Sequence, residues 1–243
     1  MSSPDPQAVN AMFARIAPRY DLVNRVLTGG IDLYWRKLLT RRVAALSPQH
    51  VVDLATGSGD VAFALRRTLP RECSVMGLDF CQPMLDQANN RQERKKTDPP
   101  IVFRQGDILN LELEDQSADA VTISFGLRNL ADRPRGLAEI RRILRPGGEL
   151  IILEFTQPYR LIRPFYFFYL RRILPYLAGI LSGDLSAYRY LNQSIEAFPN
   201  REEISEELKA AGFQVREATP LTGGIVCLHR GQVPPNANPS NLP

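Results

Sequence analysis

The sequence predicts an α/β protein with a doubly wound, mostly parallel seven-stranded sheet that ends in an antiparallel hairpin strand. From residue 51 onwards, short apolar runs alternate with helical patterns, which is typical of a parallel sheet covered by helices. Near the C-terminus, two predicted strands, residues 213–220 and 223–230, are separated only by a turn within "LTGG". A parallel return requires a dozen or more residues, so these strands are expected to run antiparallel.

Length and composition describe one folded α/β domain. The 243 residues can bury a substantial core, and 44% of them are hydrophobic. A formal net charge of +4 suits an anionic membrane surface or an acidic ligand, but it does not by itself indicate nucleic acid. The cysteines lack zinc-type spacing, so we expect free thiols in a reducing cytoplasm and no metal site; they are Cys73, Cys81 and Cys227.

The N-terminus is expected to form a helical cap over residues 1–45. Its first residues lack the apolar core of a signal peptide. Four apolar residues then recur with the spacing of an amphipathic helix: Val9, Met12, Phe13 and Ile16. A second helix is expected to continue to the Gly29–Gly30 break, where Asp32 would cap a third. The third helix would turn these residues inward: Trp35, Leu38, Leu39 and Val43.

Residues 46–157 are expected to form the cofactor-binding core. The strands predicted there cover residues 51–54, 75–78, 101–104, 120–124 and 150–153, and the helices cover residues 60–69, 83–94 and 135–144. Residues 201–231 would complete the core with a helix over 201–211, whose Glu202 and Glu203 suit its positive N-terminus, and with the antiparallel hairpin. Residues 232–243 are expected to be a disordered tail.

The turn "ATGSG" after the first strand determines which class of ligand is expected. Gly57, Gly59 and Ala62 satisfy a loose dinucleotide-binding pattern, which alone would favour a nucleotide-dependent oxidoreductase. However, Asp53 and Asp60 flank the turn, and two carboxylates would repel a pyrophosphate. They suit a cationic ligand without phosphate, such as S-adenosylmethionine, whose amino-acid end the glycines would let approach the backbone.

The remaining cofactor contacts are expected at the carboxyl ends of the next strands. Asp79 would accept both ribose hydroxyls, and Asp107 would bind the exocyclic amine of adenine. A single such carboxylate is often only a helix cap, but four at successive strand ends are harder to explain in that way. The full predicted set, including residues that would flank the adenine or face the cleft, is Asp53, Thr56, Gly57, Ser58, Gly59, Asp79, Phe80, Met84, Asp107, Ile108 and Ser124.

Several blocks of the chain resemble the quinone-biosynthesis C-methyltransferases of the ubiquinone/menaquinone type, which are class I S-adenosylmethionine-dependent enzymes with a Rossmann-like fold. These blocks are "MFARIAPRYDLVNRVLTGGIDLYWR", "VVDLATGSGDVA", "ISFGLRNLADRPRGLAEIRRILRPGGELIILEF" and "YRYLNQSIEAFPNREEISEELKAAGF". The likeness runs from residue 12 to about residue 231, and it is greatest to the demethylphylloquinone (2-phytyl-1,4-naphthoquinone) methyltransferases. The turn departs from the commoner G-G-T-G of the bacterial ubiquinone enzymes, but Ser58 retains the hydroxyl.

This resemblance implies methyl transfer from S-adenosylmethionine to a ring carbon of a prenylated quinol. The expected substrate is a naphthoquinol, demethylphylloquinol or demethylmenaquinol, and the alternative is the benzoquinol of ubiquinone biosynthesis. A nucleic-acid methyltransferase is less favoured, because "SFGL" stands where such enzymes usually carry an Asn/Asp-Pro-Pro-aromatic block. The chemistry requires no metal, and whether the chain forms a homodimer stays open.

A quinol carbon attacks a methyl group well only when the neighbouring hydroxyl is ionised. Arg128 is therefore expected to stabilise the oxyanion, with Asn129 positioning a water or the second oxygen, unless Arg128 merely pairs with Asp132. Tyr20, in the "RYD" block, would donate a hydrogen bond to the quinol or pack beneath a lid. His229 is a further candidate base, although a lone histidine at a strand end is more often structural.

Residues 158–200 form an aromatic-rich insertion. Residues 158–181 contain seven aromatic residues, interspersed with Arg160, Arg163, Arg171 and Arg172. The segment is either a buried lid or an interfacial element with its arginines at lipid headgroups. Because a prenylated substrate does not readily leave a bilayer, we expect a cytoplasmic protein peripherally associated with the inner or thylakoid membrane.

Overall fold

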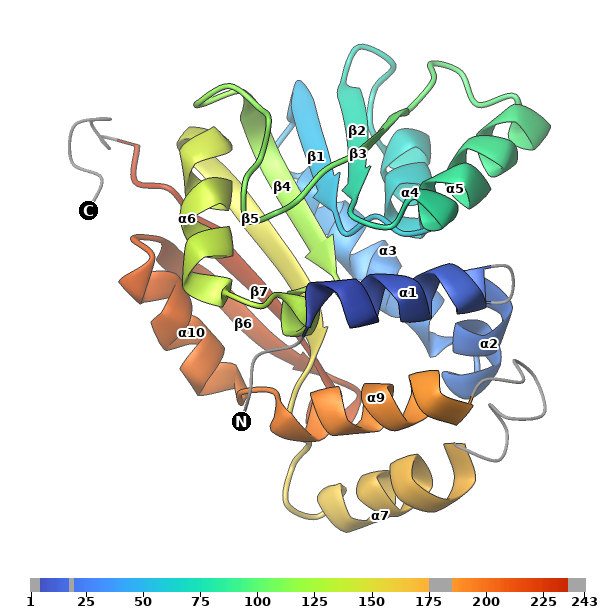
Figure 1. The fold of residues 1–243 in the computed structure, drawn as a ribbon. Helices are drawn as coiled ribbons and strands as arrows, with labels where there is room; N and C mark the ends of the chain where they lie inside the picture. The colour runs from blue at the N-terminus through green and yellow to red at the C-terminus, as the bar shows by residue number, and fades with distance from the viewer. Residues whose placement is uncertain (1–4, 18–19, 175–184, 236–243) are drawn as a thin grey trace.

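The computed structural model describes residues 5–17, 20–174 and 185–235. Seven strands form one sheet in the order β3-β2-β1-β4-β5-β7-β6 (Figure 1). The first five strands pair in parallel, whereas β7 lies antiparallel between β5 and β6, as the sequence predicted. Their bounds are β1 His50–Leu54, β2 Ser74–Asp79, β3 Val102–Gln105, β4 Ala118–Ser124, β5 Leu144–Phe155, β6 Gln214–Leu221 and β7 Val226–Gln232.

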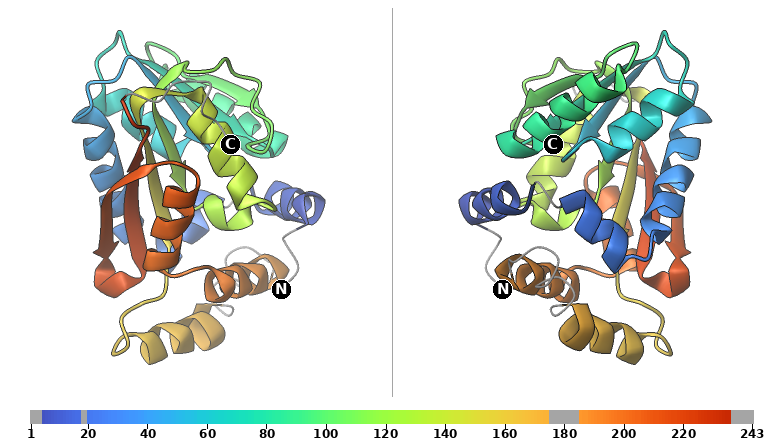
Figure 2. Two further views of the ribbon diagram at one scale, coloured as in Figure 1. Left: turned by 90° about the vertical axis from the view of Figure 1, so that its left-hand side faces the viewer. Right: turned by 90° about the vertical axis from the view of Figure 1, so that its right-hand side faces the viewer.

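Helices cover both faces of this sheet (Figure 2). Helices α3 (Ile31–Ala44) and α4 (Asp60–Thr68) pack with the strands in one buried apolar cluster. Helices α6 (Arg133–Ile143) and α10 (Arg201–Ala210) contribute to a second cluster with other side chains of the sheet. Helix α5 (Gln82–Lys95) contacts β2 and β3. The central strands are therefore buried on both faces, which explains their nearly continuous apolar sequence.

A separate helical layer lies at the end of the sheet toward which β4 runs (Figure 1). It contains α1 (Pro6–Ile16), α2 (Tyr20–Leu27), α7 (Arg163–Phe168), the π-helical turn η3 (Tyr169–Ile173) and α9 (Leu185–Ala197). These elements share one buried apolar cluster, which includes Met12, Ile16, Val23, Tyr166, Leu170 and Ile195. Two segments far apart in the sequence thus form one layer, which we call the cap.

The structure corrects two expectations for the N-terminal region. Helix α3 belongs to the core rather than to the cap, because Trp35, Leu39 and Val43 pack against the sheet. Asp32 does not cap this helix, because Gly30 precedes its first turn with a φ of 78°. The Asp32 carboxylate is instead buried and accepts a hydrogen bond from the Thr28 hydroxyl at 2.9 Å.

The C-terminal part begins with the predicted helix, and its ordered contacts extend past residue 231, where the core was expected to end. The Asn200 side chain and Glu203 form a reciprocal capping box at the start of α10. Gln232 still belongs to β7, and buried Val233 donates its N–H to the Gly148 carbonyl at 2.9 Å. The expected tail boundary at residue 232 is therefore too early, and residues 236–243 lie outside the described residues. No helix in the described ranges is both long and apolar enough to cross a membrane.

Candidate active site

A first cavity lies where β1, β2 and β4 end, at the usual ligand site of open α/β sheets. It brings together ten of the eleven residues predicted to contact a cofactor: Asp53, Thr56, Gly57, Ser58, Asp79, Phe80, Met84, Asp107, Ile108 and Ser124. The eleventh, Gly59, is not part of this cavity lining; it is the residue immediately before α4.

Both glycines of the turn are required by its geometry. Gly57 has a φ of +56°, and a Cβ there would lie 3.1 Å from the Met84 Cε. Gly59 has a φ of +84°, and a Cβ there would lie 2.9 Å from the rings of Phe63 and Phe103. Only glycine adopts these conformations without strain at such close contact. The backbone can therefore approach a ligand directly.

Asp79 is fixed by backbone donors on both of its carboxylate oxygens. Its Oδ2 accepts from the Gly57 N–H at 2.7 Å, and its Oδ1 accepts from the Cys81 N–H at 2.8 Å. Burial raises the pKa of this carboxyl, while the backbone donors oppose that rise. Each oxygen keeps a further lone pair, so the carboxylate can accept two neighbouring hydroxyls, as a ribose presents them.

Asp53, near the end of β1, fixes the turn through hydrogen bonds. Its two oxygens accept from the hydroxyls of Thr56 and Thr122, both at 2.6 Å. Desolvation raises its pKa from 3.8 to about 6. Thr56, which replaces a glycine of the commoner turn, is thus tied to the end of β1.

Asp60 lines the first cavity, but its carboxylate is already paired with arginines, which the sequence did not indicate. It accepts from Arg91 at 2.6 Å, from Arg36 at 2.9 Å and from Arg25 at 3.3 Å. These arginines lower the pKa of its carboxyl despite its burial. The neighbouring Asp21 carboxylate accepts from the Ser58 hydroxyl at 2.5 Å, so the "RYD" block does lie over the turn. We call Arg25, Arg36, Arg91, Asp21, Asp32 and Asp60 the arginine–aspartate cluster.

The far end of the first cavity suits a flat heterocycle. Asp107 is exposed, and its Oδ1 accepts from the Leu109 N–H at 2.9 Å, so Oδ2 can accept an amine. Ile108 and Met84 are buried, and Phe80 is exposed beside them. The Ser124 hydroxyl oxygen is buried and has no hydrogen-bond partner among the described residues. Such an orphaned polar group indicates a place for a ligand.

A second cavity, of about 550 Å³, adjoins the first. It lies between the cap and the core, and its walls are mostly apolar and aromatic, including Trp35, Phe155, Tyr166, Leu170, Leu174 and Ile195. The residues common to both cavities are Phe13, Arg36 and Phe125. Its volume is within the range of small-molecule sites.

Arg128 and Asn129 lie at different cavities. The Arg128 side chain lines the second cavity, and its Nη1 donates to the Glu154 Oε1 at 2.9 Å. It therefore does not pair with Asp132, which instead caps α6 through the Arg135 N–H. Asn129 lines the first cavity, and its Oδ1 accepts from the Tyr190 hydroxyl at 3.0 Å.

The other two catalytic candidates have different outcomes. Tyr20 begins α2, but its side chain lies outside the described residues. His229 is buried in β7, where its Nε2 lies 3.1 Å from the Arg201 carbonyl oxygen. Burial lowers its pKa, and it belongs to neither described cavity lining. The structure therefore does not bring His229 together with the other candidate catalytic residues, and its buried position matches the structural alternative.

Sequence reasoning missed the residues that join the two cavities. Arg36 lies on a helix that was assigned only to packing, and Tyr190 lies in the aromatic-rich insertion. Trp35 donates its indole N–H to the Thr222 hydroxyl, 187 positions away, at 2.8 Å. The sequence offered one signal for this site, which is the position of Arg36. It follows Asp32 by one helical turn, on a helix whose apolar residues were expected to point inward.

Comparison with known proteins gives a consistent result. The model of the ubiE/COQ5 methyltransferase family matches residues 1–233. A demethylmenaquinone methyltransferase of Thermus thermophilus is 43% identical over 92% of this chain and 100% of the relative. The ubiquinone/menaquinone biosynthesis C-methyltransferase UbiE of Bdellovibrio bacteriovorus is 39% identical, covering 95% and 98%. A solved S-adenosylmethionine-dependent methyltransferase from Aquifex aeolicus shares the fold, with a TM-score of 0.60 at 16% identity over 80% and 89% of the two chains.

Proposed function

The chain belongs to the ubiE/COQ5 methyltransferase family, and we propose that this S-adenosylmethionine-dependent C-methyltransferase acts on a prenylated naphthoquinol. The products would be menaquinol from demethylmenaquinol, or phylloquinol from demethylphylloquinol. The observation that carries the proposal is the large apolar cavity that adjoins the cofactor-type cavity and contains a buried arginine. Methylation of a benzoquinol is the alternative, because relatives named for both pathways match the chain.

The residues of the first cavity fit S-adenosylmethionine. Asp79 would hold the ribose, Asp107 and Ile108 the adenine, and the backbone around Gly57 the amino-acid end, with the unpartnered Ser124 hydroxyl available to the ligand. When bound, the cofactor supplies an electrophilic methyl group: a ring-carbon electron pair forms the new C–C bond, and the pair of the broken S–C bond stays on sulfur. No metal-ligand cluster occurs among the described residues.

The residues of the second cavity prepare the quinol for this attack. The quinol hydroxyl must lose its proton so that electron density enters the ring. Arg128 places a positive charge in apolar surroundings, although Glu154 offsets part of it. Asn129, on the cofactor side, positions a water or the second oxygen. After methyl transfer, the proton of the attacked ring carbon leaves to water, and the ring becomes aromatic again.

A direct assay tests this function. The purified protein is given S-adenosylmethionine with a labelled methyl group and a short-tailed demethylnaphthoquinol, with the matching benzoquinol as the comparison. Label is expected in the naphthoquinol, and S-adenosylmethionine rather than NADH is expected to raise the melting temperature. Label in neither quinol would refute the proposal, whereas preference for the benzoquinol would select the alternative. In cells lacking the protein, the demethyl quinone that accumulates should be the same species.

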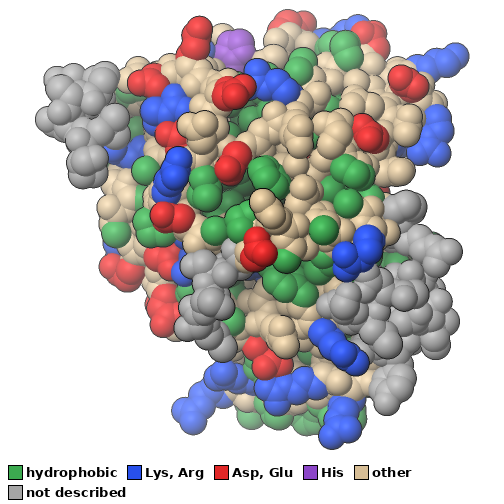
Figure 3. All heavy atoms as spheres, in the orientation of Figure 1, with side chains coloured by type: hydrophobic (Ala, Val, Ile, Leu, Met, Phe, Trp, Pro, Cys, Tyr) green, Lys and Arg blue, Asp and Glu red, His purple; other side chains and the backbone are tan. Residues whose placement is uncertain are grey.

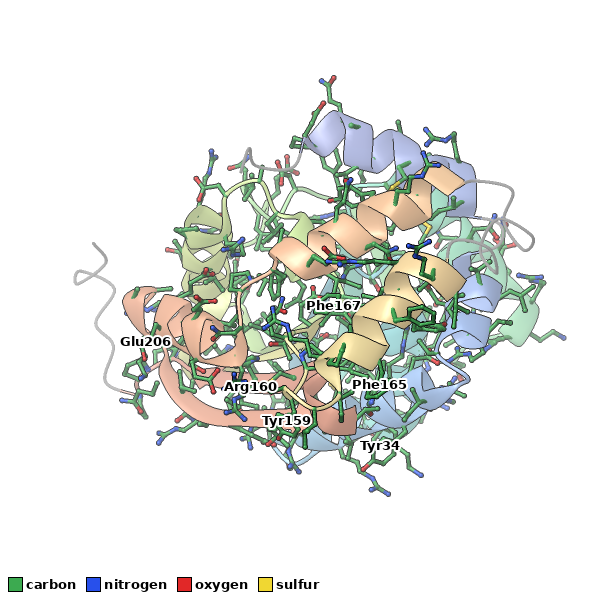
Figure 4. All side chains as sticks on the ribbon, turned by 90° about the horizontal axis from the view of Figure 1, so that it is seen from below. Tyr34, Tyr159, Arg160, Phe165, Phe167 and Glu206 are labelled. Atoms are coloured by element: carbon green, nitrogen blue, oxygen red, sulfur yellow. The ribbon has the colours of Figure 1, made fainter. Side chains whose placement is uncertain are left out.

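The cap also has an outer face that suits a membrane. Leu161, Phe165 and Phe168 are 87%, 76% and 61% exposed, while Tyr166 and Leu170 of the same segment point into the second cavity. Lys and Arg side chains gather among hydrophobic ones at this lower end (Figure 3). Seen from below, the labelled side chains of Tyr159, Arg160 and Phe165 lie on this side of the molecule (Figure 4).

We infer that the segment of α7 and η3 serves both as a lid and as a membrane contact, through opposite faces. The inner face walls the substrate cavity, and the outer face would rest reversibly on the cytoplasmic side of the inner or thylakoid membrane. Its exposed arginines match anionic headgroups: Arg160, Arg163 and Arg172. A prenyl tail could then pass between bilayer and cavity without crossing water.

Liposome flotation tests this association. Removing two aromatic rings with Phe165→Ser/Phe168→Ser should weaken partition into anionic vesicles by at least about tenfold, because each ring taken out of water contributes on the order of 1.5 kcal/mol. Val102→Ser removes a comparably exposed apolar side chain from β3 and should not change partition. Equal flotation of wild type and the double variant would contradict the proposal.

A further inference from the structure

Arg36 stands where the two cavities meet. It lies in the second turn of α3, its side chain is only 14% exposed, and it lines both cavities together with Phe13 and Phe125. Arg128, by contrast, lines the second cavity alone. We propose that Arg36 is the catalytic residue that binds the ionised quinol oxygen nearest the methyl donor, and that Arg128 holds the other oxygen. This assignment rests on the function proposed above.

The hydrogen bonds of Arg36 leave donors for a ligand. Its Nη1 donates to Asp60 at 2.9 Å. Its Nε lies 3.6 Å from the Asp32 Oδ2, too far for a hydrogen bond, and this buried nitrogen has no hydrogen-bond partner among the described residues. A guanidinium carries five N–H donors in a fixed plane. Because the Nε is fully buried, an anionic oxygen at the junction would be met by the outer N–H groups of the guanidinium rather than by Nε.

A pair of aromatic rings connects the two arginines. The ring centroids of Phe125 and Phe155 are 4.7 Å apart. The Arg36 guanidinium carbon lies 6.0 Å from the Phe125 centroid, and that of Arg128 lies 5.4 Å from the Phe155 centroid. A planar quinol that stacks on this pair carries its two oxygens on opposite sides of the ring. Each oxygen would then meet one arginine.

The two arginines are held in different ways. Arg128 is paired with Glu154 at 2.9 Å. Arg36 lies beside Asp60 and Asp32, and both carboxylates also contact other arginines of the arginine–aspartate cluster. This cluster, with three residues of each sign, therefore fixes the guanidinium of Arg36 at the junction. Preorganised N–H donors in a site that excludes water stabilise a developing anion most effectively.

The test compares Arg36→Met with Arg42→Met. Arg42 lies on the same helix and donates to the Glu217 carboxylate at 2.9 Å, outside the arginine–aspartate cluster, and it does not appear in either described cavity lining. Arg36→Met should lower kcat for the naphthoquinol by about 100-fold near neutral pH, the usual effect of losing one oxyanion donor. The loss should shrink at alkaline pH, because a phenolic hydroxyl with a pKa of about 10 then ionises unaided. Arg42→Met should change kcat by less than about threefold at every pH, with KM for S-adenosylmethionine unchanged in both.

Arg36→Lys keeps the assignment testable if the methionine variant folds poorly. It retains the charge and the pairing with Asp60, so it should show a smaller loss with the same alkaline recovery. Equal losses for Arg36→Met and Arg42→Met, or a loss that does not change with pH, would give Arg36 a purely structural role in α3 and overturn the proposal. Absence of turnover by the wild-type protein would instead refute the proposed function, so the two failures are distinguishable.

Discussion

The two cavities that meet at Arg36 are constructed in different ways. The first lies at the ends of neighbouring strands, where backbone contacts such as the Gly57 N–H on Asp79 hold the turn, and α1, α2 and α3 complete its walls with Phe13, Asp21 and Arg36. The second is enclosed mainly by side chains from α1, α2, α3, α7, η3 and α9, which meet through the packing of the cap. The first therefore depends largely on a local motif, and the second depends on the docking of two distant segments.

This difference has a consequence for function. The cofactor side is fixed by the same sheet that forms the core, so it should be complete before any quinol arrives. The quinol side is fixed by a small apolar cluster at the edge of the molecule, which is the less stable kind of region. Substitutions should therefore separate the two sites, with cofactor affinity sensitive to one set of residues and quinol turnover sensitive to the other.

The largest effect is expected for Asp79→Asn. It removes the charge and one acceptor from the carboxylate that receives the Gly57 and Cys81 N–H groups. One of the two expected ribose hydrogen bonds then loses its acceptor and the other loses its charge, which together cost about 4 kcal/mol, so affinity for S-adenosylmethionine should fall about 1,000-fold by calorimetry. Asp107→Asn, at an exposed position, should weaken affinity less than about tenfold. Similar losses for both variants would mean that Asp79 does not anchor the cofactor.

A smaller effect, confined to the other cavity, is expected for Leu170→Ala. Leu170 is 2% exposed and lines the second cavity from η3. Truncation at such a site costs about 3 kcal/mol, which should loosen the cap and raise KM for the quinol while leaving the affinity for S-adenosylmethionine unchanged. Leu161→Ala, in the same segment but 87% exposed, serves as the control. A parallel loss of cofactor affinity in Leu170→Ala would contradict the independence of the two cavities.

The same contrast explains what the sequence could predict. The parallel strands and the glycine turn follow from alternation and spacing along the chain, and ten of the eleven residues predicted to contact a cofactor line the first cavity. Its walls from α1 and α3 were not predicted, because these helices reach the strand ends only through tertiary packing. The second cavity was not predicted, because the contact between Trp35 and Thr222 and the approach of α9 to Asn129 depend on tertiary packing.

Charge partners were also hidden from the sequence. Asp60 looked like an open carboxylate, because the sequence spacing gives no sign that Arg25, Arg36 and Arg91 converge on it. His229 was a candidate base because histidine titrates near neutral pH, and the sequence does not show that it lies against the Arg201 carbonyl of another element. In both cases the contact between distant residues could not be read from the sequence.

The pH dependence of the unfolding free energy should reveal how much the burial of the Asp53 carboxyl destabilises the folded protein. Its pKa of about 6 in the folded protein exceeds the unfolded value of 3.8, so the folded state binds the proton more tightly. The stability contributed by this group is present at low pH and is lost as pH rises through about 6. Relative to Asp53→Asn, the unfolding free energy of the wild type should therefore fall by about 2 kcal/mol between about pH 4.5 and pH 7. Urea titrations at several pH values would measure it, and a pH-independent difference would show that the carboxyl is ionised throughout.

The smallest effect tests the hydrogen bond that joins α9 of the cap to Asn129 on the cofactor side. The Tyr190 hydroxyl of α9, which lines the second cavity, donates to the Asn129 Oδ1, which lines the first, at 3.0 Å. Tyr190→Phe removes a bond worth about 1 kcal/mol, so kcat should fall about fivefold while KM for S-adenosylmethionine is unchanged. Tyr169→Phe is the matched control, because its hydroxyl donates to the Leu27 carbonyl at 2.8 Å within the cap. It should lower stability by a similar amount and leave kcat unchanged. If the two variants lost the same fraction of kcat, Tyr190 would serve only to close the cap, and Asn129 would not need its orientation from the quinol side.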